Sequence, residues 1–261
     1  MNNNKTNLLL KIDHVKLLFS IFKNDNSELR LVGGSIRDIL INREIGDIDS
    51  ATSLEPNDVL NLLKKNNIEY DDFAIRYGSI IAYPNNKKIQ ITSLREDINQ
   101  LGRHTSVLYT KDWKKDAARR DFTFNALYLD ENFKIHDFYN GQKDLETKTI
   151  KFIGEIEDRI KEDYLRIYRY FRFLGLFDLP LTNNKTQTIV EKYIHESLAV
   201  LTNDIIRQEV LKMFNMPYPL NCFYQSKVKF KWVEILKEHF IKTNYDLGLN
   251  KCINKIDNII N

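Results

Sequence analysis

Two carboxylates, Asp47 and Asp49, are separated by one residue in the stretch GDIDSAT. Side chains two positions apart on a strand point to the same face, so a strand here would project both carboxylates together. A carboxylate pair completed by the phosphates of a nucleotide is a common way to hold Mg²⁺. The alternative is a pair of solvated groups at a strand end, because most isolated Asp-x-Asp pairs bind nothing.

A double glycine precedes this pair. Gly33 and Gly34 follow a short apolar run and lead into a helix-like segment, so the chain turns tightly where backbone N–H groups are available. Such a turn can hold phosphates. Arg37 on that segment is either part of a surface salt bridge with Asp38 or a ligand of triphosphate oxygens. A phosphate cradle beside a carboxylate pair predicts metal-dependent phosphate chemistry.

Adjacent arginines, Arg119 and Arg120, stand before Asp121 and lead directly into an apolar strand. The strand would carry at least one guanidinium toward the sheet, where it needs an anionic partner. That partner is either a bound anion or Asp121 in a buried structural pair. The residues alone leave both interpretations open.

A further set of charged residues recurs at every third position: Asp163, Arg166, Arg169 and Arg172. On a helix such neighbours lie close together, and ion pairs on an amphipathic helix are one explanation. The other explanation is recognition of a base edge. Adenine and cytosine both offer an amino donor beside an acceptor, which an Asp and an Arg complement, whereas guanine and uracil reverse the pattern.

The elements that must position these groups follow from the apolar spacing. Period-two patterns and turn residues predict strands at 28–32, 47–52 and 125–129 and a hairpin within 68–94 that turns at 84–86. Helical spacing predicts an amphipathic first helix and further helices at 35–41, from Pro56 to about residue 66, and at 111–120. The polar segment Arg95 to Thr105 is interpreted as a loop beside the site.

Beyond about Gly141 the strand signals stop. Helical spacing continues through residues 155–177, 186–200, 204–214, 229–241 and 252–259. The predicted fold is therefore α+β, with a mixed-sheet catalytic domain at 1–148 and an all-helical domain at 149–261. In the second domain Lys227 to Trp232, KVKFKW, is a candidate RNA contact, and an ordinary amphipathic edge is its alternative.

Composition limits the class of protein. The 261 residues are 43% hydrophobic and 29% charged, which is enough to bury a substantial core. The net charge of +3 is mild, so any basic surface must be local. Cys222 and Cys252 form no CxxC pattern, so no disulfide framework or zinc site is indicated. No run of membrane-spanning length and no cleavable leader is evident, and we expect a cytoplasmic protein without a membrane partner.

Six motifs occur in a fixed order between residues 29 and 173: LVGGSIRD, GDIDSAT, ITSLRED, RRDFTFNAL, FYNGQKDL and EDYLRIYRYFRF. This series resembles the class II branch of the polymerase-β-like nucleotidyltransferases, the bacterial tRNA CCA-adding enzymes and their poly(A) polymerase relatives. The resemblance implies a nucleotidyltransferase head with a mixed sheet, followed by a helical neck and body. It also implies attack by the 3′-hydroxyl of tRNA on the α-phosphate of CTP or ATP, with release of pyrophosphate.

The resemblance further implies roles for individual residues. Asp47 and Asp49 would bind two Mg²⁺ ions, and Asp163 with Arg166 would form a protein template for the base. Arg120 would serve both catalysis and nucleotide binding. The complete set of nucleotide-binding residues expected from the motifs is Gly33, Gly34, Ser35, Arg37, Arg120, Asp121, Asp163, Arg166, Arg169 and Arg172. The polymer partner would be the acceptor end of tRNA.

The sequence departs from the family pattern in three ways. Tyr164 stands where the family usually has Pro, and Ile205 replaces an Arg in the segment DIIRQEV. The chain is also shorter than most members, so we expect tRNA recognition to be confined to the acceptor end. Nothing in the sequence sets the oligomeric state.

The region after the carboxylate pair distinguishes CCA-adding enzymes from poly(A) polymerases within the family that the chain resembles. Residues 78–80 and 91–95 resemble the CCA-adding pattern, and the Gly-basic-basic-Phe segment of poly(A) polymerases is absent. We therefore predict CCA addition. Poly(A) synthesis and addition of only C or only the final A are the alternatives. A non-catalytic RNA-binding descendant would have lost the carboxylates or the template, and both are present.

Overall fold

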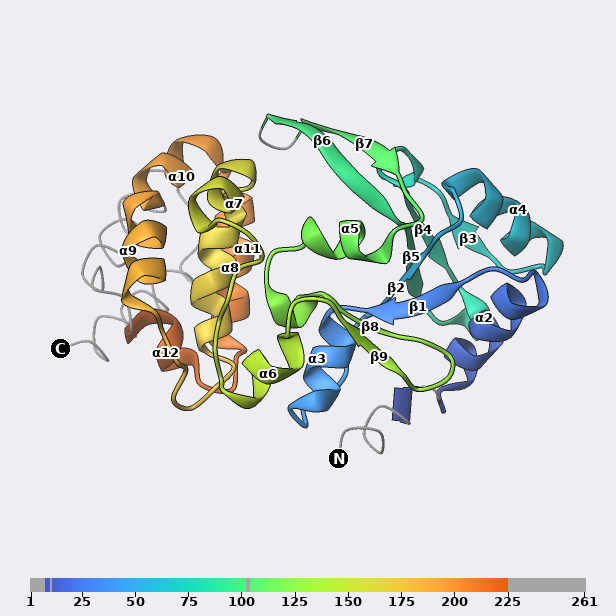
Figure 1. The fold of residues 1–261 in the computed structure, drawn as a ribbon, viewed down its shortest axis with the longest axis horizontal. Coiled ribbons are helices and arrows are strands. Elements are labelled where there is room, and N and C mark those ends of the chain that lie inside the picture. The colour runs from blue at the N-terminus through green and yellow to red at the C-terminus, as the bar shows by residue number, and fades with distance from the viewer. Residues whose placement is uncertain (1–7, 10, 102–103, 225–261) are drawn as a thin grey trace. The chain divides into compact units, whose positions relative to one another are not determined.

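A computed structural model describes residues 8–9, 11–101 and 104–224 (Figure 1). The chain forms two compact units. The first comprises residues up to 147 together with 151–154, and the second comprises 148–150 and the residues from 155 onward. Short bridges explain the exchange of segments, because Phe152 pairs with Phe122 in the first unit and Thr149 pairs with Leu181 in the second.

A mixed sheet organises the first unit. Its strand order is β3-β4-β5-β2-β1-β8-β9, with β2 and β5 parallel and every other pair antiparallel. The α+β class with a mixed sheet is therefore confirmed. The strands are β1 (Leu29–Val32), β2 (Ile48–Thr52), β3 (Tyr70–Asp71), β4 (Ser79–Ala82), β5 (Ile89–Ser93), β8 (Leu127–Leu129) and β9 (Ile135–Asp137).

Helices cover this sheet and connect its strands. They are α2 (Asp13–Asn24), α3 (Gly34–Leu40), α4 (Pro56–Lys65), α5 (Trp113–Ala118) and α6 (Gly141–Glu146). Helix α4 begins at Pro56, whose fixed φ suits a first turn, and ends at Lys65, so the predicted helix is confirmed. Helix α3 packs against β1, β2 and β8, which keeps the double-glycine turn on the central strands.

The segment predicted as a polar loop is instead part of a hairpin. Strand β6 (Arg95–Leu101) pairs antiparallel with β7 (His104–Tyr109) in a separate two-stranded sheet. The loop prediction was wrong because the backbone pairing of a short polar hairpin leaves no alternation of apolar and polar residues in the sequence. Its base joins the main sheet through Leu94, which is buried and accepts a hydrogen bond from Thr110 N at 3.0 Å.

A buried cluster lies beneath the central strands. Val32 of β1, Ala51 of β2 and Tyr128 of β8 pack with Trp113 at the start of α5. The rings of Trp113 and Tyr128 meet edge to face with centroids 5.3 Å apart. This packing ties α5, and the arginines that follow it, to the middle of the sheet.

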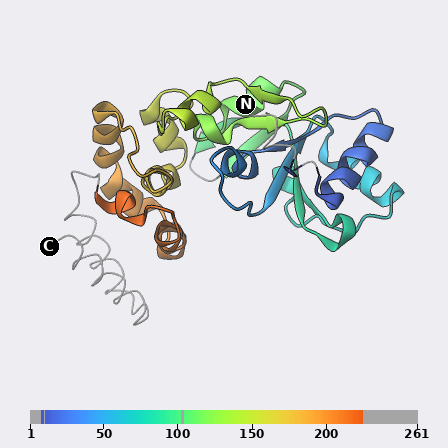
Figure 2. The ribbon, with the colours of Figure 1, turned by 90° about the horizontal axis from the view of Figure 1, so that it is seen from below.

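In its described part, the second unit consists of helices and one isolated bridge. The helices are α7 (Ile156–Glu162), α8 (Leu165–Leu174), α9 (Asn184–Lys192), α10 (Ile194–Val200), α11 (Asn203–Phe214) and α12 (Pro219–Tyr224). Figure 2 shows the change along the chain by colour, from blue and green in the sheet unit to yellow and orange in the helices. The helices predicted at 229–241 and 252–259, and the segment 227–232, lie outside the described residues.

One predicted helix, 155–177, is broken into α7 and α8. Asp163 at the break is extended, with φ −151° and ψ 103°, and its carboxylate accepts a hydrogen bond from Leu165 N at 3.0 Å. A side chain that accepts from the backbone N–H two residues later, as in an Asx turn, competes with continuation of the helix. Helix α8 then packs against α11 and α12.

Candidate active site

The carboxylate pair lies at the start of β2. Asp49 is half-buried and opposite Val32 of β1, whereas Asp47 is exposed and precedes the strand by one residue. The strand therefore begins one position later than predicted. Burial raises the pKa of the Asp49 carboxyl, the charge of Arg120 opposes that shift, and the nearby charge of Asp47 adds to it. A divalent cation would relieve the repulsion between the two carboxylates.

Guanidinium groups flank the double-glycine turn that follows β1. Gly33 has φ +79° and ψ −125°, a conformation that residues with a side chain rarely adopt. A Cβ on Gly33 would lie 3.8 Å from Arg120 Nη1, and a Cβ on Gly34 would lie 3.5 Å from Arg37 Nη2. The missing side chains thus leave space that two cations border, which suits a phosphate group.

The hydroxyl of Ser35, the next residue, is also notable. Ser35 is buried, and its Oγ has no hydrogen-bond partner within the part of the chain that the structure describes. Buried hydroxyls are usually satisfied, so an unpaired one at a predicted phosphate site points to an oxygen supplied by a ligand.

Arg37 is held in place by neighbouring side chains. It is only 9% exposed, and it donates to both carboxylate oxygens of Asp38 at 2.9 Å and to Asn125 Oδ1 at 2.7 Å. Asn125 Nδ2 in turn donates to Asp121 Oδ1 at 3.0 Å. The Arg37–Asp38 salt bridge is therefore present, but it is buried rather than on the surface. Asp121 accepts hydrogen bonds from Asn125 Nδ2 and from the backbone N–H of Phe122.

Both adjacent arginines pair with Asp116, a residue that the two sequence interpretations did not include. Arg119 Nη2 lies 2.7 Å from Asp116 Oδ1, and Arg120 Nη2 lies 3.1 Å from Oδ2. The sequence interpretation missed Asp116. Its signal was present, because an Asp three and four positions before two arginines is the spacing of helical ion pairs.

Asp116 is fully buried and charged. Burial alone would raise the pKa of its carboxyl, but Arg120, Arg119 and the hydroxyl of Tyr128 outweigh burial and lower the pKa to about 2. Burial raises the pKa of Tyr128, which keeps this hydroxyl protonated as a donor to Asp116.

In the second unit, the predicted base template is assembled around the break between α7 and α8. Arg166 is buried, and its Nη1 donates to Glu162 Oε2 at 2.6 Å and to the backbone oxygen of Arg159 at 2.9 Å. Asp163 lies outside α8, so the expectation of one helical row of four residues was wrong: only the three arginines are on the helix. The role of Asp163 and Arg166 in base selection stays a prediction.

The two remaining arginines lie along α8. The guanidinium carbons of Arg169 and Arg172 are 5.5 and 4.5 Å from the centroid of the Phe173 ring. Arg172 Nε also lies 2.8 Å from the carboxylate of Glu209 on α11, a residue that is 2% exposed. Glu209 belongs to the DIIRQEV segment, and its pairing with Arg172 was not predicted.

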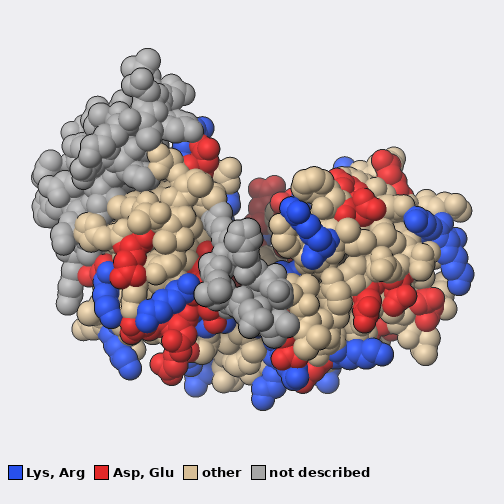
Figure 3. Space-filling model, turned by 90° about the horizontal axis from the view of Figure 1, so that it is seen from above, with Lys and Arg blue, Asp and Glu red and all other residues tan. Residues whose placement is uncertain are grey.

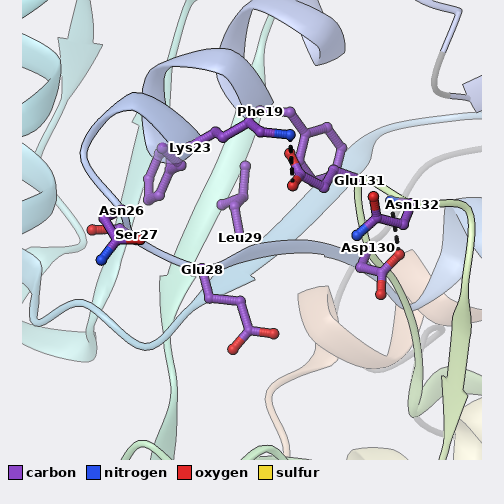
Figure 4. Close-up of a pocket in the computed structure, with 10 residues that line it drawn as sticks. Phe19, Lys23, Asn26, Ser27, Glu28, Leu29, Asp130, Glu131 and Asn132 are labelled. Carbon is purple, nitrogen blue, oxygen red and sulfur yellow. Dashed lines mark hydrogen bonds and ion pairs between the residues drawn. The ribbon is translucent and has the colours of Figure 1, made fainter.

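One hollow in the described part of the chain is lined by residues other than these groups. It has a volume of about 280 Å³ and lies beside Glu28, before β1, whereas the glycine turn follows β1 (Figure 4). Its carboxylates already have partners: Glu28 bonds Trp113 Nε1 at 2.9 Å, Asp130 bonds His136 at 2.7 Å and Glu131 bonds Lys23 at 3.1 Å. The acidic side chains that line this hollow therefore make contacts within the folded protein.

Two further features are absent from the described residues. Among residues 8–9, 11–101 and 104–224, no group of three or more His, Cys, Asp or Glu side chains is arranged to hold a metal ion. No described helix is both long and apolar enough to cross a bilayer. On the face in Figure 3, small groups of basic and acidic side chains are interspersed.

Comparison with known proteins assigns the family. The Poly A polymerase head domain model matches residues 29–151. The human mitochondrial CCA tRNA nucleotidyltransferase 1 is 40% identical over 168 residues, which are 64% of this chain and 39% of that protein. The Listeria innocua CCA-adding enzyme is 32% identical over 224 residues, 85% of this chain and 50% of that protein. The chain belongs to the family of nucleotidyltransferases with a poly(A) polymerase head domain.

Solved members of this family share its fold. A Bacillus stearothermophilus CCA-adding enzyme in complex with CTP superposes with a TM-score of 0.72 at 27% identity, covering 81% of this chain and 50% of that one. A Thermotoga maritima CCA-adding enzyme complexed with tRNA gives 0.68 at 23% identity over 93% of this chain and 57% of that one. The chain spans about half the length of these relatives. The matched head-domain residues contain Asp47, the glycine turn and Arg120, so the first-unit site lies within the family domain.

Proposed function

We propose that this chain is a template-independent RNA nucleotidyltransferase that adds CCA to the 3′ end of tRNA from CTP and ATP, with release of pyrophosphate. The main support is that the guanidinium groups of Arg37 and Arg120 lie close to the double-glycine turn. This turn follows β1, the strand that pairs with the Asp49 strand. The names of the relatives, CCA tRNA nucleotidyltransferase and CCA-adding enzyme, support this choice of substrate.

The residues present fit a hard divalent cation. Nucleotidyltransferases of this family generally use divalent metal ions, and Asp47 and Asp49 supply the oxygen ligands that Mg²⁺ prefers. Burial raises the pKa of Asp49, and the nearby charge of Asp47 adds to that shift. We propose two Mg²⁺ ions, which when bound would lower the pKa of the primer hydroxyl and neutralise the leaving group.

The other first-unit residues orient the nucleotide. Arg37 and Arg120 would meet phosphate oxygens at the glycine turn, where the buried Ser35 hydroxyl would donate to another oxygen. Because acidic neighbours already fix both guanidiniums, little reorganisation is needed when the nucleotide binds. Holding the α-phosphate in line with the primer hydroxyl is the main contribution that these residues make.

The second unit would choose the base. The contacts of Arg166 with Glu162 and the Arg159 backbone orient its guanidinium, and Asp163 supplies a carboxylate acceptor. This donor and acceptor complement adenine and cytosine but not guanine or uracil. Arg169 and Arg172 would contact the triphosphate, with Arg172 keeping its ion pair with Glu209.

The cellular compartment is proposed on composition alone. Two cysteines without a metal or disulfide pattern fit the reducing cytoplasm. One curated relative is named as mitochondrial.

The test is incorporation into tRNA that lacks its 3′ CCA, with CTP and ATP supplied singly and together. Sequential addition of C, C and A, followed by termination, is the expected result. An unbounded A tail would establish poly(A) synthesis, and arrest after two C residues or a requirement for preformed CC would establish a partial activity. Intact RNA binding without incorporation would overturn the catalytic proposal.

A further inference from the structure

We infer that Asp116 is a positioning residue for the nucleotide: its buried carboxylate orients Arg120 toward the Gly33–Gly34 turn, while Arg119 balances its second oxygen. This inference rests on the proposed function, because it assigns a task to a residue that acts through Arg120. No contact between Asp116 and the substrate is required.

The two oxygens of Asp116 are divided between the arginines. Oδ1 accepts from Arg119 Nε at 2.8 Å, and Oδ2 accepts from Arg120 Nε at 3.3 Å and Nη2 at 3.1 Å. Tyr128 completes the arrangement, since its hydroxyl donates to Oδ2 at 2.7 Å and accepts from Arg120 Nε at 3.1 Å. The carboxylate is therefore anchored on the sheet side by β8 and on the helix side by α5.

This pairing sets the direction of Arg120. A guanidinium is planar, and Nε with Nη2 forms one of its edges, so holding that edge at Oδ2 turns Nη1 away from Asp116. Nη1 is the atom that lies 3.8 Å from a Cβ built on Gly33. The buried acid thus directs the opposite side of the guanidinium to the predicted phosphate site.

The arginines of this cluster are poorly solvated. The side chains of Arg119 and Arg120 are only 16% and 17% exposed. A cation in such a place is stabilised by nearby negative charge. Asp49 is close enough to interact electrostatically with Arg120. A triphosphate at the glycine turn would add further negative charge.

A core ion pair that only stabilises the fold is the competing explanation. The two explanations differ in what they predict for nucleotide affinity. A positioning role requires Asp116 to act through Arg120, so the loss of either residue should affect the same quantity. A structural role would lower the melting temperature without a selective effect on nucleotide binding.

The experiment measures the dissociation constant for CTP with Mg²⁺ and without RNA, the KM values for CTP and RNA, and the melting temperature. The variants are Asp116→Asn, Arg120→Ala and the double variant. Asp116→Asn should weaken CTP binding about tenfold, the range expected for losing a charge-assisted contact, with little change in KM for RNA. In the Arg120→Ala background, Asp116→Asn should add no further weakening, because the residue it positions is gone.

Two more variants serve as a control and as a second test. Asp130→Asn is the matched control: it removes an ion-paired carboxylate just after β8, and it should leave CTP binding unchanged. Tyr128→Phe removes only the hydroxyl shared by Asp116 and Arg120, and it should weaken CTP binding about threefold even where Asp116→Asn fails to fold.

The outcomes separate the inference from the proposed function. Unchanged CTP affinity in both Asp116→Asn and Tyr128→Phe would overturn the inference, as would independent, multiplying effects of Asp116→Asn and Arg120→Ala. Those results would leave CCA addition by the wild type intact. Absence of CTP binding by the wild type would overturn both.

Discussion

The arginines of the two units are held in different ways. In the first unit, Arg37 and Arg120 are oriented by carboxylates and reach a glycine turn that sheet pairing brings close to Asp49. In the second, the arginines of α8 pair with an acid at the end of α7, stack on a ring of their own helix, or meet Glu209 of α11. Under the proposed function, the first arrangement would contact phosphates, which all nucleotides share, whereas Arg166 and Asp163 of the second would contact the base edge, which differs between nucleotides.

From this difference we expect that substitutions can change the chemistry and the choice of substrate separately. Substitutions in the first unit should reduce incorporation of every nucleotide alike. Substitutions at the break between α7 and α8 should alter the ratio between nucleotides. The following predictions test that separation, beginning with the largest expected effect.

Asp49→Ala should lower incorporation of both CTP and ATP by at least about a thousandfold, because it would remove a proposed ligand of Mg²⁺. Its melting temperature should stay close to the wild-type value, since the pairing of β2 uses the backbone of Asp49, which alanine keeps. Primer-extension rates and thermal unfolding measure the two quantities. Asp72→Ala, at an exposed position, is the control. Substantial residual activity in Asp49→Ala would reject its role as a metal ligand.

Gly33→Ala should lower incorporation of both nucleotides about a hundredfold. The new Cβ would occupy a backbone conformation with φ +79° and border Arg120 Nη1 at 3.8 Å. Strain of this kind costs roughly 1–3 kcal/mol, so unfolding in urea should show a loss of stability as well.

Gly46→Ala is the matched control for that substitution. No atom of the described residues lies within 4 Å of a Cβ built on Gly46, and its φ is not in the left-handed region. This variant should retain wild-type activity. Equal behaviour of the two variants would show that the glycine turn does not matter for catalysis.

Arg166→Ala should reduce the preference for CTP and ATP over GTP and UTP about tenfold, the size expected for losing one directional polar contact. The comparison needs kcat/KM for all four nucleotides on the same primer. Lys185→Ala, an exposed change in the same unit, should leave the preference unchanged. If Arg166→Ala lowered all four rates equally, the separation between the units would fail.

Asp116 should make stability depend on pH in the acid range. The folded carboxyl has a pKa of about 2 against an ordinary value of 3.8, so its contribution is complete above about pH 4 and is lost as the pH falls toward 2. That contribution is about 2 kcal/mol. Urea unfolding at pH 6, 4 and 3 should show the decline in wild type and a smaller decline in Asp116→Asn. Parallel declines would remove Asp116 from the acid sensitivity.

Local patterns predicted much of the fold. Pro56 and the apolar residues of α4 marked that helix correctly, and the Pro84–Asn86 turn marked the β4–β5 hairpin, because propensity and hydrophobic period act over a few residues. The β6–β7 hairpin was not predicted, because its polar residues do not alternate with apolar ones. The break at Asp163 was not predicted, because a hydrogen bond from a backbone N–H to a side chain two residues earlier can end a helix inside an unbroken apolar pattern.

The site was predicted less evenly. Asp47, Asp49 and the double glycine were predicted from spacing, since the groups are close in sequence, and the structure places Asp49 opposite Val32, the residue before the glycine turn. The partners of the arginines were not found, although Asp116 lies only four residues before Arg120. The contact of Asn125 with Arg37 joins residues 88 positions apart, and that of Glu209 with Arg172 joins two helices, so no local pattern reveals either.

The sequence by itself determined the chemical groups, the order of the elements and the family to which they belong. Only the tertiary structure decided which carboxylate each arginine contacts and where each guanidinium points. The physical reason is that side-chain type and periodicity are local properties of the chain. The direction of a buried charge depends instead on which partners the sheet register and helix packing bring within hydrogen-bond distance.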